Sequence, residues 1–130
     1  MLKHVTPGNI RPPFARYSHA VEIPAGSRVV LCSGQLGVAP DDSLPPTIEG
    51  QTERCFANIS AILAECGMSL ADVVRLNAYV SGREHLPGYM AARDRFISNP
   101  PPASTLMIVT GFARPEFLVE VEAIAARSET

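Results

Sequence analysis

The sequence lacks long apolar runs, an apolar leader and clusters of basic residues, and each absence excludes a class of protein. No run approaches the roughly 20 apolar residues of a membrane-spanning helix, so we expect no membrane partner. The N-terminus, MLKHVTPGNI, does not resemble a signal peptide, which favours a cytoplasmic protein. The net charge is -2 and the basic residues are scattered, which argues against a nucleic-acid partner.

Motifs for metal binding and nucleophilic catalysis are also lacking. The three cysteines are odd in number and show no CxxC spacing, which favours reduced, apolar fillers over disulfides or a zinc site. The three histidines lie far apart, so we expect no metal site. There is no GxGxxG, P-loop, HExxH or GxSxG motif, and Ser33 has no adjacent histidine and acid to activate it. The cysteines and histidines are Cys32, Cys55, Cys66, His4, His19 and His85.

The length of 130 residues suits one domain, which can bury about two-thirds of its unfolded surface. We therefore expect a single domain over residues 1–130, without a linker or an internal repeat. Residues 1–15 hold three prolines and a glycine. Because proline blocks regular backbone pairing, this segment is expected to be an irregular N-terminal arm.

Hydrophobic periodicity divides the rest of the chain into five strands and two helices. Strands are expected at 16–23, 28–33, 72–80, 104–110 and 117–125. One helix is expected at about 47–66, and a second from a capping box at Ser81 and Glu84 to about Ile97. The order β-β-α-β-α-β-β predicts an α+β fold in which two helices cover one face of a sheet.

The opposite face of the predicted sheet is also apolar. Leu31 on the second strand and Leu118 and Ile124 on the last strand would lie there. A sheet face of this kind is not expected to remain in water. We therefore predict that it is buried against another subunit.

Glu120 and Glu122 are the first signal of possible chemistry, since a spacing of two places both on one face of the last strand. Alternating charge is typical of a solvated face, and that interpretation stays open. If a subunit covers the face, at least one carboxylate would be desolvated, and its pKa would rise or it would need a partner. Such a group could act as a general acid or base, or could anchor a ligand.

Other polar residues of interest lie at strand ends and turns. Tyr17 begins the first strand and is either a core-edge aromatic or a site residue. Arg75 lies on the polar face of a central strand, where it either forms a surface or interface ion pair or belongs to a site. Arg16 and Arg114 are expected to be exposed, and either could bind an anionic ligand bidentately.

Several motifs, taken together and in order, resemble the Rid family (reactive intermediate deaminases, also called the YjgF family). No single one would suffice, but they span nearly the whole chain. They are Tyr17-Ser18-His19-Ala20, Val30-Leu31-Cys32-Ser33-Gly34-Gln35, Gln51 with Asn58, Pro102-Ala103-Ser104-Thr105, and Val119-Glu120-Val121-Glu122-Ala123-Ile124-Ala125.

The resemblance implies a chorismate-mutase-like fold and a homotrimer, in which the sheets face inward as a barrel and three clefts form between subunits. Family enzymes hydrolyse enamines and imines such as 2-aminoacrylate, giving 2-keto acids and ammonia without a cofactor. A small-molecule substrate or ligand is therefore the expected partner. The matched positions suggest Glu120 and Tyr17 as catalytic residues, and Ser33 and Gly34 as ligand-binding residues.

The chain departs from the family where deaminating members read Pro-Ala-Arg, because here the segment is Pro102-Ala103-Ser104. The serine hydroxyl cannot replace the bidentate cationic fork that pairs with a substrate carboxylate. The favoured hypothesis is a small-molecule cleft that includes Ser104 and acts, if at all, on an imine or enamine other than 2-aminoacrylate. Arg16, Arg75 or Arg114 would then bind the anion. A standard deaminase and a non-catalytic regulatory protein are the alternatives.

Overall fold

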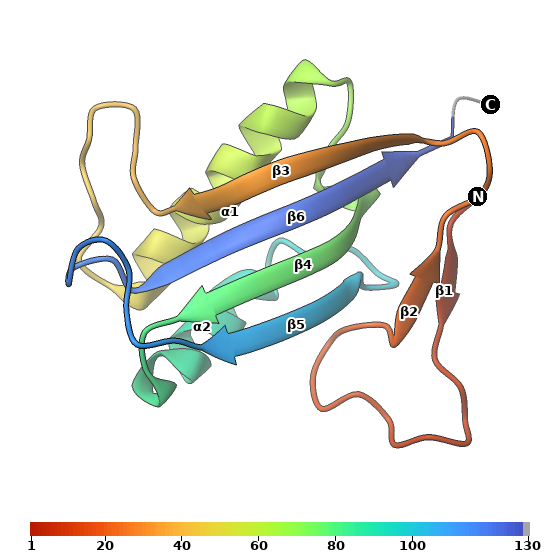
Figure 1. Ribbon diagram of the computed structural model, residues 1–130, viewed down its shortest axis with the longest axis horizontal. Coiled ribbons are helices and arrows are strands. Elements are labelled where there is room, and N and C mark those ends of the chain that lie inside the picture. The colour runs from red at the N-terminus through yellow and green to blue at the C-terminus, as the bar shows by residue number, and fades with distance from the viewer. Residues whose placement is uncertain (129–130) are drawn as a thin grey trace.

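Four strands form the central sheet of the computed structural model, which describes residues 1–128 (Figure 1). In space they follow the order β3 (Arg28–Leu36), β6 (Val119–Arg127), β4 (Val73–Val80) and β5 (Ala103–Ile108). β6 is antiparallel to both of its neighbours, whereas β4 and β5 are parallel. A parallel pair needs a crossover connection, which here contains the second helix. β5 is left at one edge of the sheet.

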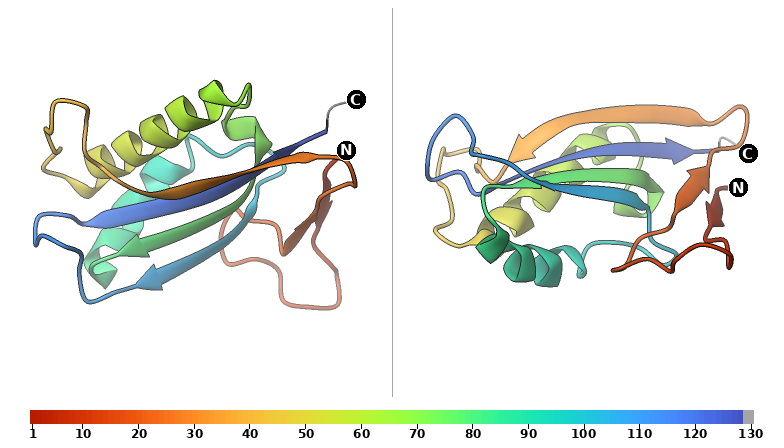
Figure 2. Two further views of the ribbon diagram at one scale, coloured as in Figure 1. Left: turned by 45° about the horizontal axis from the view of Figure 1, so that its top comes forward. Right: turned by 60° about the horizontal axis from the view of Figure 1, so that its bottom comes forward.

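Two helices, α1 (Ile48–Glu65) and α2 (Leu86–Arg93), cover the same face of this sheet (Figure 2). Each fully buried apolar side chain stabilises the fold by about 1.5–3 kcal/mol. The apolar inner face of α1 therefore holds this helix against the strands. The expected α+β arrangement is therefore confirmed, with α1 within one residue of its predicted bounds. The buried side chains between the layers include Cys55, Phe56, Ile59 and Leu63 of α1 and Leu76, Ala78, Val80, Val119 and Val121 of the sheet.

The second helical segment differs from its prediction at both ends. The predicted capping box is wrong: Gly82 precedes a short 3-10 turn, η2 (Arg83–His85), and no side chain caps it. The Ser81 amide instead donates to the carbonyl oxygen of Leu118 at 3.1 Å, which keeps this residue with the sheet. α2 then ends at Arg93 and not near Ile97, because the following amides close tighter turns that reach back only three residues.

The N-terminal region is also organised differently. Residues 3–5 of the expected irregular arm form β1 (Lys3–Val5), which pairs with β2 (Ala20–Glu22) in a separate two-stranded sheet. Since the prolines begin only at residue 7, nothing prevents residues 3–5 from pairing. The strand expected at 16–23 is therefore limited to its last part. Tyr17 follows a bend at residues 14–16, and Ser18 makes a single bridge to Ala103.

The face of the sheet away from the helices carries both polar and apolar groups. Leu31 is 75% exposed and Met107 is 53% exposed. The register also places the side chains of Tyr79, Glu120 and Glu122 on this face, so the predicted pairing of the two carboxylates is confirmed. We call this surface the open face. None of the helices in residues 1–128 is long and apolar enough to cross a membrane.

Candidate functional site

Glu120 lies on the open face, where the register sets it opposite Leu36 of β3 and Tyr79 of β4. Its carboxylate folds over the backbone of Gly34, so that a Cβ atom at Gly34 would lie 2.9 Å from the carboxyl carbon. Ser33, next to this glycine, is exposed. The structure therefore brings together three of the residues singled out in the sequence: Glu120, Ser33 and Gly34.

A break in the strand register shapes this cluster. The pairing of β3 with β6 shifts between Cys32 and Gln35, which places Ser33 and Gly34 in the irregular part of the strand. α1 fixes the next stretch of backbone, because the Cys55 thiol donates to the Gln35 carbonyl at 3.1 Å. Asn58 donates to the carbonyls of Leu36 and Val38 at 3.3 and 3.2 Å.

Gln51 holds the loops on either side of the same cluster. Its side chain is 1% exposed, and its amide nitrogen donates to the carbonyls of Pro45 at 3.1 Å and Glu116 at 2.9 Å. Its amide oxygen accepts from the Leu118 amide at 2.9 Å. Gln51 and Asn58, which served as marks of resemblance in the sequence, therefore act as structural ties between α1 and the backbone near Glu120.

The two carboxylates of the last strand have different surroundings. Glu122 Oε1 accepts hydrogen bonds from the Tyr79 hydroxyl at 2.9 Å and from Asn77 Nδ2 at 3.1 Å. The bond to Glu122 raises the pKa of Tyr79. Within residues 1–128 no donor makes a hydrogen bond to Glu120. Glu122 is thus engaged within the sheet, whereas Glu120 retains its capacity to accept a proton or a hydrogen bond.

Cys55, on the helix behind this cluster, is not a nucleophile. Burial raises the pKa of its thiol to about 12, and the negative charge of Glu120 adds to the rise. A protonated, buried thiol is unreactive. This agrees with the prediction that the cysteines are fillers, and all three are free.

Tyr17 and Ser104 lie elsewhere, in a cavity of about 400 Å³ at the edge of the sheet. The segment before β2, helix α2 and strand β5 each contribute to its wall, and we call it the Tyr17 cavity. The volume falls within the range of small-molecule sites. The lining residues are Phe14, Ala15, Tyr17, Tyr89, Met90, Arg93, Ser104, Thr105 and Leu106.

Local hydrogen bonds hold Tyr17 at this cavity. Its hydroxyl accepts from the Phe14 amide at 3.3 Å, and its ring meets His19 edge-on with 5.9 Å between centroids. Ser18, which is buried, donates through its hydroxyl to Pro101 O at 2.7 Å and through its amide to Pro102 O at 3.0 Å. The segment before β2 is thereby fixed to the start of β5.

The Glu120 cluster and the Tyr17 cavity lie on opposite faces of the sheet. Ser104 pairs with buried Leu76 and so faces the helices, whereas Glu120 pairs with Tyr79 on the open face. Two strand spacings and three residues along β5 separate the backbones of Ser104 and Glu120, roughly 14 Å. Within one chain, the predicted catalytic pair of Glu120 and Tyr17 therefore does not come together.

None of the three arginines suggested as anion anchors lines the Tyr17 cavity. Arg16 is exposed and donates to the Asp94 carbonyl at 3.1 Å. Arg75 donates to Thr105 Oγ1 at 2.7 Å on the open face, where it lines a separate hollow of about 310 Å³ with His19. Arg114 lies in the turn before β6, 5.4 Å from the ring of Phe117.

Arg93 does line the Tyr17 cavity, and sequence reasoning missed it. In the sequence, Arg93 falls at helical spacing with Leu86, Tyr89, Met90, Phe96 and Ile97, on an apolar stripe where an arginine is normally explained by its aliphatic stem. Arg93 is in fact 1% exposed. The one available signal was a cation on an otherwise apolar stripe, next to the segment that contains Ser104.

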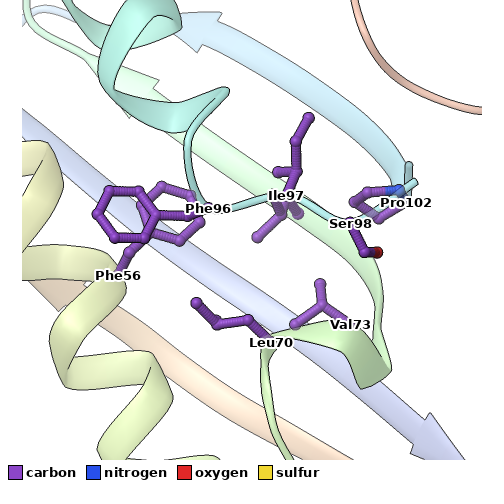
Figure 3. A pocket seen from close by; sticks show the side chains of 8 residues that line it. Phe56, Leu70, Val73, Phe96, Ile97, Ser98 and Pro102 are labelled. Atoms are coloured by element: carbon purple, nitrogen blue, oxygen red, sulfur yellow. The ribbon is translucent and has the colours of Figure 1, made fainter. Parts of the chain in front are cut away.

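A further internal void is too small to bind a metabolite (Figure 3). It holds about 10 Å³ among apolar side chains, beside the stacked rings of Phe56 and Phe96 with 5.2 Å between centroids. Such a volume suits at most one water molecule. The part of the chain that the structure describes also contains no cluster of side chains that could hold a metal ion.

Comparisons with known proteins find relatives over most of the chain. A family model described as Endoribonuclease L-PSP matches residues 9–127. A RutC family protein of Saccharolobus solfataricus is 30% identical over 118 residues, which cover 89% of this chain and 90% of the relative. A protein of Dermatophagoides farinae named 2-iminobutanoate/2-iminopropanoate deaminase is 28% identical over 86% of each chain.

A solved structure is similar over the whole fold. It is a protein of unknown function of the Rid family from Yersinia pestis, with a TM-score of 0.85 and 31% identity. The match covers 97% of this chain and 98% of the other.

Proposed function

Because the chain belongs to the Endoribonuclease L-PSP family, which is the Rid or YjgF family, we propose that its copies form clefts that bind a small carboxylate-bearing metabolite. In these clefts Glu120 orients a water molecule that hydrolyses an imine or enamine other than 2-aminoacrylate. The division of the site residues between two faces of the sheet carries this proposal. Neither the Glu120 cluster nor the Tyr17 cavity is a complete site within one chain.

A second copy would complete the site at the edge of the sheet. The Tyr17 cavity includes residues of β5, which is an edge strand, so a neighbouring chain can approach it directly. The open face holds exposed Leu31 and Met107, which favours burial between subunits. A homotrimer with the open faces inward would bring the Glu120 cluster of one chain to the Tyr17 cavity of the next.

The chemistry requires one base. Water adds its oxygen to the imine carbon while Glu120 accepts one of its protons. The proton then passes to the nitrogen, which gives a carbinolamine. As the carbon–nitrogen bond breaks, the remaining hydroxyl proton moves to the nitrogen, so that a ketone and ammonia leave. Glu120 suits this role better than Glu122, because Glu122 is already engaged by Tyr79 and Asn77. The name of the deaminase from Dermatophagoides farinae supports the choice of reaction.

Ser104 argues against 2-aminoacrylate as the substrate. In the family segment Pro-Ala-Arg the guanidinium pairs with a substrate carboxylate, and a hydroxyl cannot offer the same two charged hydrogen bonds. The non-catalytic alternative stays open as an outcome of the experiment below. The family description also names an endoribonuclease, which a net charge of -2 does not favour for a polyanionic substrate.

The experiment compares substrates and two matched variants. A dehydratase generates 2-aminoacrylate, an amino-acid oxidase generates larger 2-imino acids, and the release of keto acid is followed with and without the protein. We expect acceleration with the larger imines, a large loss in Glu120→Gln, and a rate near that of the wild type in Glu122→Gln.

Other results would change the conclusion. Acceleration with 2-aminoacrylate would indicate the standard deaminase, and binding without acceleration of any imine would indicate a regulatory protein. Ser104→Arg is expected to create or raise activity toward 2-aminoacrylate. A monomer in light scattering would contradict the intersubunit cleft.

A further inference from the structure

Arg93 is the one arginine of the described residues that lines the Tyr17 cavity. It comes from the last turn of α2, and its side chain is 2% exposed. An arginine side chain remains charged at any physiological pH. The cavity therefore has a permanent, desolvated positive charge in its wall.

The partners of Arg93 use only part of its hydrogen-bonding capacity. Nη1 donates to Asp94 Oδ1 at 3.0 Å, and Nη2 donates to the carbonyl oxygen of Arg16 at 2.6 Å. A guanidinium has five N–H donors, so three are left, and one of these can reach the Tyr89 hydroxyl. The Asp94 side chain is 40% exposed, and water screens its charge more than it screens that of Arg93.

Tyr89 provides a second, independent observation in the same wall. It lies one helical turn before Arg93 and is 1% exposed. Its hydroxyl makes no hydrogen bond of good geometry within residues 1–128. Burial raises the pKa of Tyr89, and the nearby guanidinium of Arg93 opposes that rise. A buried hydroxyl without a partner is rare and calls for a ligand or a water molecule.

We infer that Arg93 and Tyr89 bind the carboxylate of the metabolite, which places the anion anchor on α2 and not on β5. The guanidinium supplies the charge and the tyrosine hydroxyl adds a hydrogen bond. Met90, Leu106 and Phe14 supply apolar surface elsewhere in the wall, which suits a small monocarboxylate with a short apolar substituent. This inference rests on the proposed function for the existence of a carboxylate ligand, and it goes further in naming the residues.

If Arg93 had a purely structural role, its replacement would lower the stability of the protein and not specifically its affinity for the ligand. Through Arg16 O it also ties the N-terminal segment to α2, so its replacement could simply loosen the fold. Tyr89→Phe avoids this difficulty, because it removes a hydroxyl that makes no hydrogen bond of good geometry and leaves the bonds of Arg93 to Asp94 and Arg16 O in place. Such a change is neutral or stabilising for the ligand-free protein. A loss of binding without a loss of stability would identify a ligand contact.

The experiment measures binding by calorimetry with 2-oxobutanoate and with its neutral methyl ester. The proteins are the wild type, Tyr89→Phe, Arg93→Met, Arg93→Lys and, as the matched control outside the cavity, Arg95→Met, whose exposed side chain pairs with Glu53. Thermal unfolding without ligand is recorded for each. We expect Tyr89→Phe to weaken the binding of 2-oxobutanoate about 10-fold and Arg93→Met by about 100-fold, as for hydrogen bonds to charged groups.

The controls separate this inference from the proposed function. Arg95→Met should bind as the wild type does, and the ester should bind weakly to every protein. Arg93→Lys should retain part of the affinity, because it keeps the charge but loses the fork. If Arg93→Met does not fold, Tyr89→Phe and Arg93→Lys decide the question.

Two results would overturn the inference. If the wild type binds 2-oxobutanoate and neither Tyr89→Phe nor the Arg93 variants weaken it, the anchor is elsewhere and the proposed function stands. If the wild type binds none of 2-oxobutanoate, pyruvate and benzoate, the proposed carboxylate site and its anchor both fail.

Discussion

Substituting Gly34 by alanine tests whether the position of Glu120 matters for catalysis. The new Cβ would lie 2.9 Å from the Glu120 carboxyl carbon and closer still to one of its oxygens, so the carboxylate must move. The carboxylate is the far end of a flexible side chain and can rotate away. Gly34 does not have a positive φ, so the backbone tolerates alanine there. Alanine also lowers the conformational entropy of the unfolded chain, which stabilises the folded state by about 0.4–1 kcal/mol.

The expected result is a loss of rate without a loss of stability. A misplacement of about 1 Å in a reacting group can reduce a rate about 100-fold, so the hydrolysis rate of Gly34→Ala should fall by about 10- to 100-fold. The free energy of unfolding should stay within about 1 kcal/mol of the wild type, since the displaced carboxylate makes no hydrogen bond in the described residues.

Gly37→Ala is the matched control, three residues further along the chain. There the new Cβ would lie 2.7 Å from both Cα and O of Gln51, which belong to the backbone of α1. A helix backbone cannot rotate away as a side chain can. Overpacking of this kind destabilises by about 1–3 kcal/mol, so this variant should lose stability. The hydrolysis rate per folded molecule should be higher in Gly37→Ala than in Gly34→Ala.

Urea unfolding followed by far-UV circular dichroism measures the stability of both variants, since the chain has no tryptophan. The imine assay measures the rate under conditions in which both are folded. A Gly34→Ala variant with the full wild-type rate would refute the assignment of Glu120. Equal losses of stability in the two variants would refute the distinction between a movable side chain and a fixed backbone.

Three further predictions concern stability, pH and the choice of carboxylate. Gln51→Leu leaves two loop carbonyls and one loop amide without their partner, and should destabilise by about 3 kcal/mol in urea unfolding. The raised pKa of Cys55 means that the folded state keeps a proton that the unfolded state loses. Stability should therefore fall from about pH 9 to about pH 12 by roughly 1.4 kcal/mol per pH unit, and less steeply in Cys55→Ala. Tyr79→Phe should lower stability through its lost bond to Glu122 but leave the imine hydrolysis rate near that of the wild type; a large loss of rate would implicate Glu122.

Much of the fold could be predicted because each core element has a clear period. α1 shows helical spacing over many turns, and from Val74 to Val80 strand β4 alternates between buried and partly exposed residues. The second helix was harder, because the capping sequence at Ser81 and Glu84 competes with the pairing of the Ser81 amide to Leu118 O. A local motif cannot reveal that a backbone donor already has a partner in the sheet.

The difference between Glu120 and Glu122 shows where periodicity stops being informative. The spacing of two predicts correctly that both side chains share a face, but it treats them alike. What distinguishes them is the register of β4 against β6, which sets Asn77 opposite Glu122 and brings the Tyr79 hydroxyl to the same carboxylate. Register depends on contacts distant in the chain, so sequence pattern alone could not identify the free carboxylate.

Arg93 shows the same limit for a cation. An arginine on an apolar stripe is usually explained by its stem, and only the fold places Arg93 in the wall of the same cavity as Tyr17 and Ser104. A carboxylate ligand can pair with an arginine from any element that lines the cavity. A serine at position 104 therefore removes the family's arginine from β5 without removing all cationic character from the cavity, since α2 contributes Arg93 from the facing wall. This is why we propose a changed substrate and not the loss of the site.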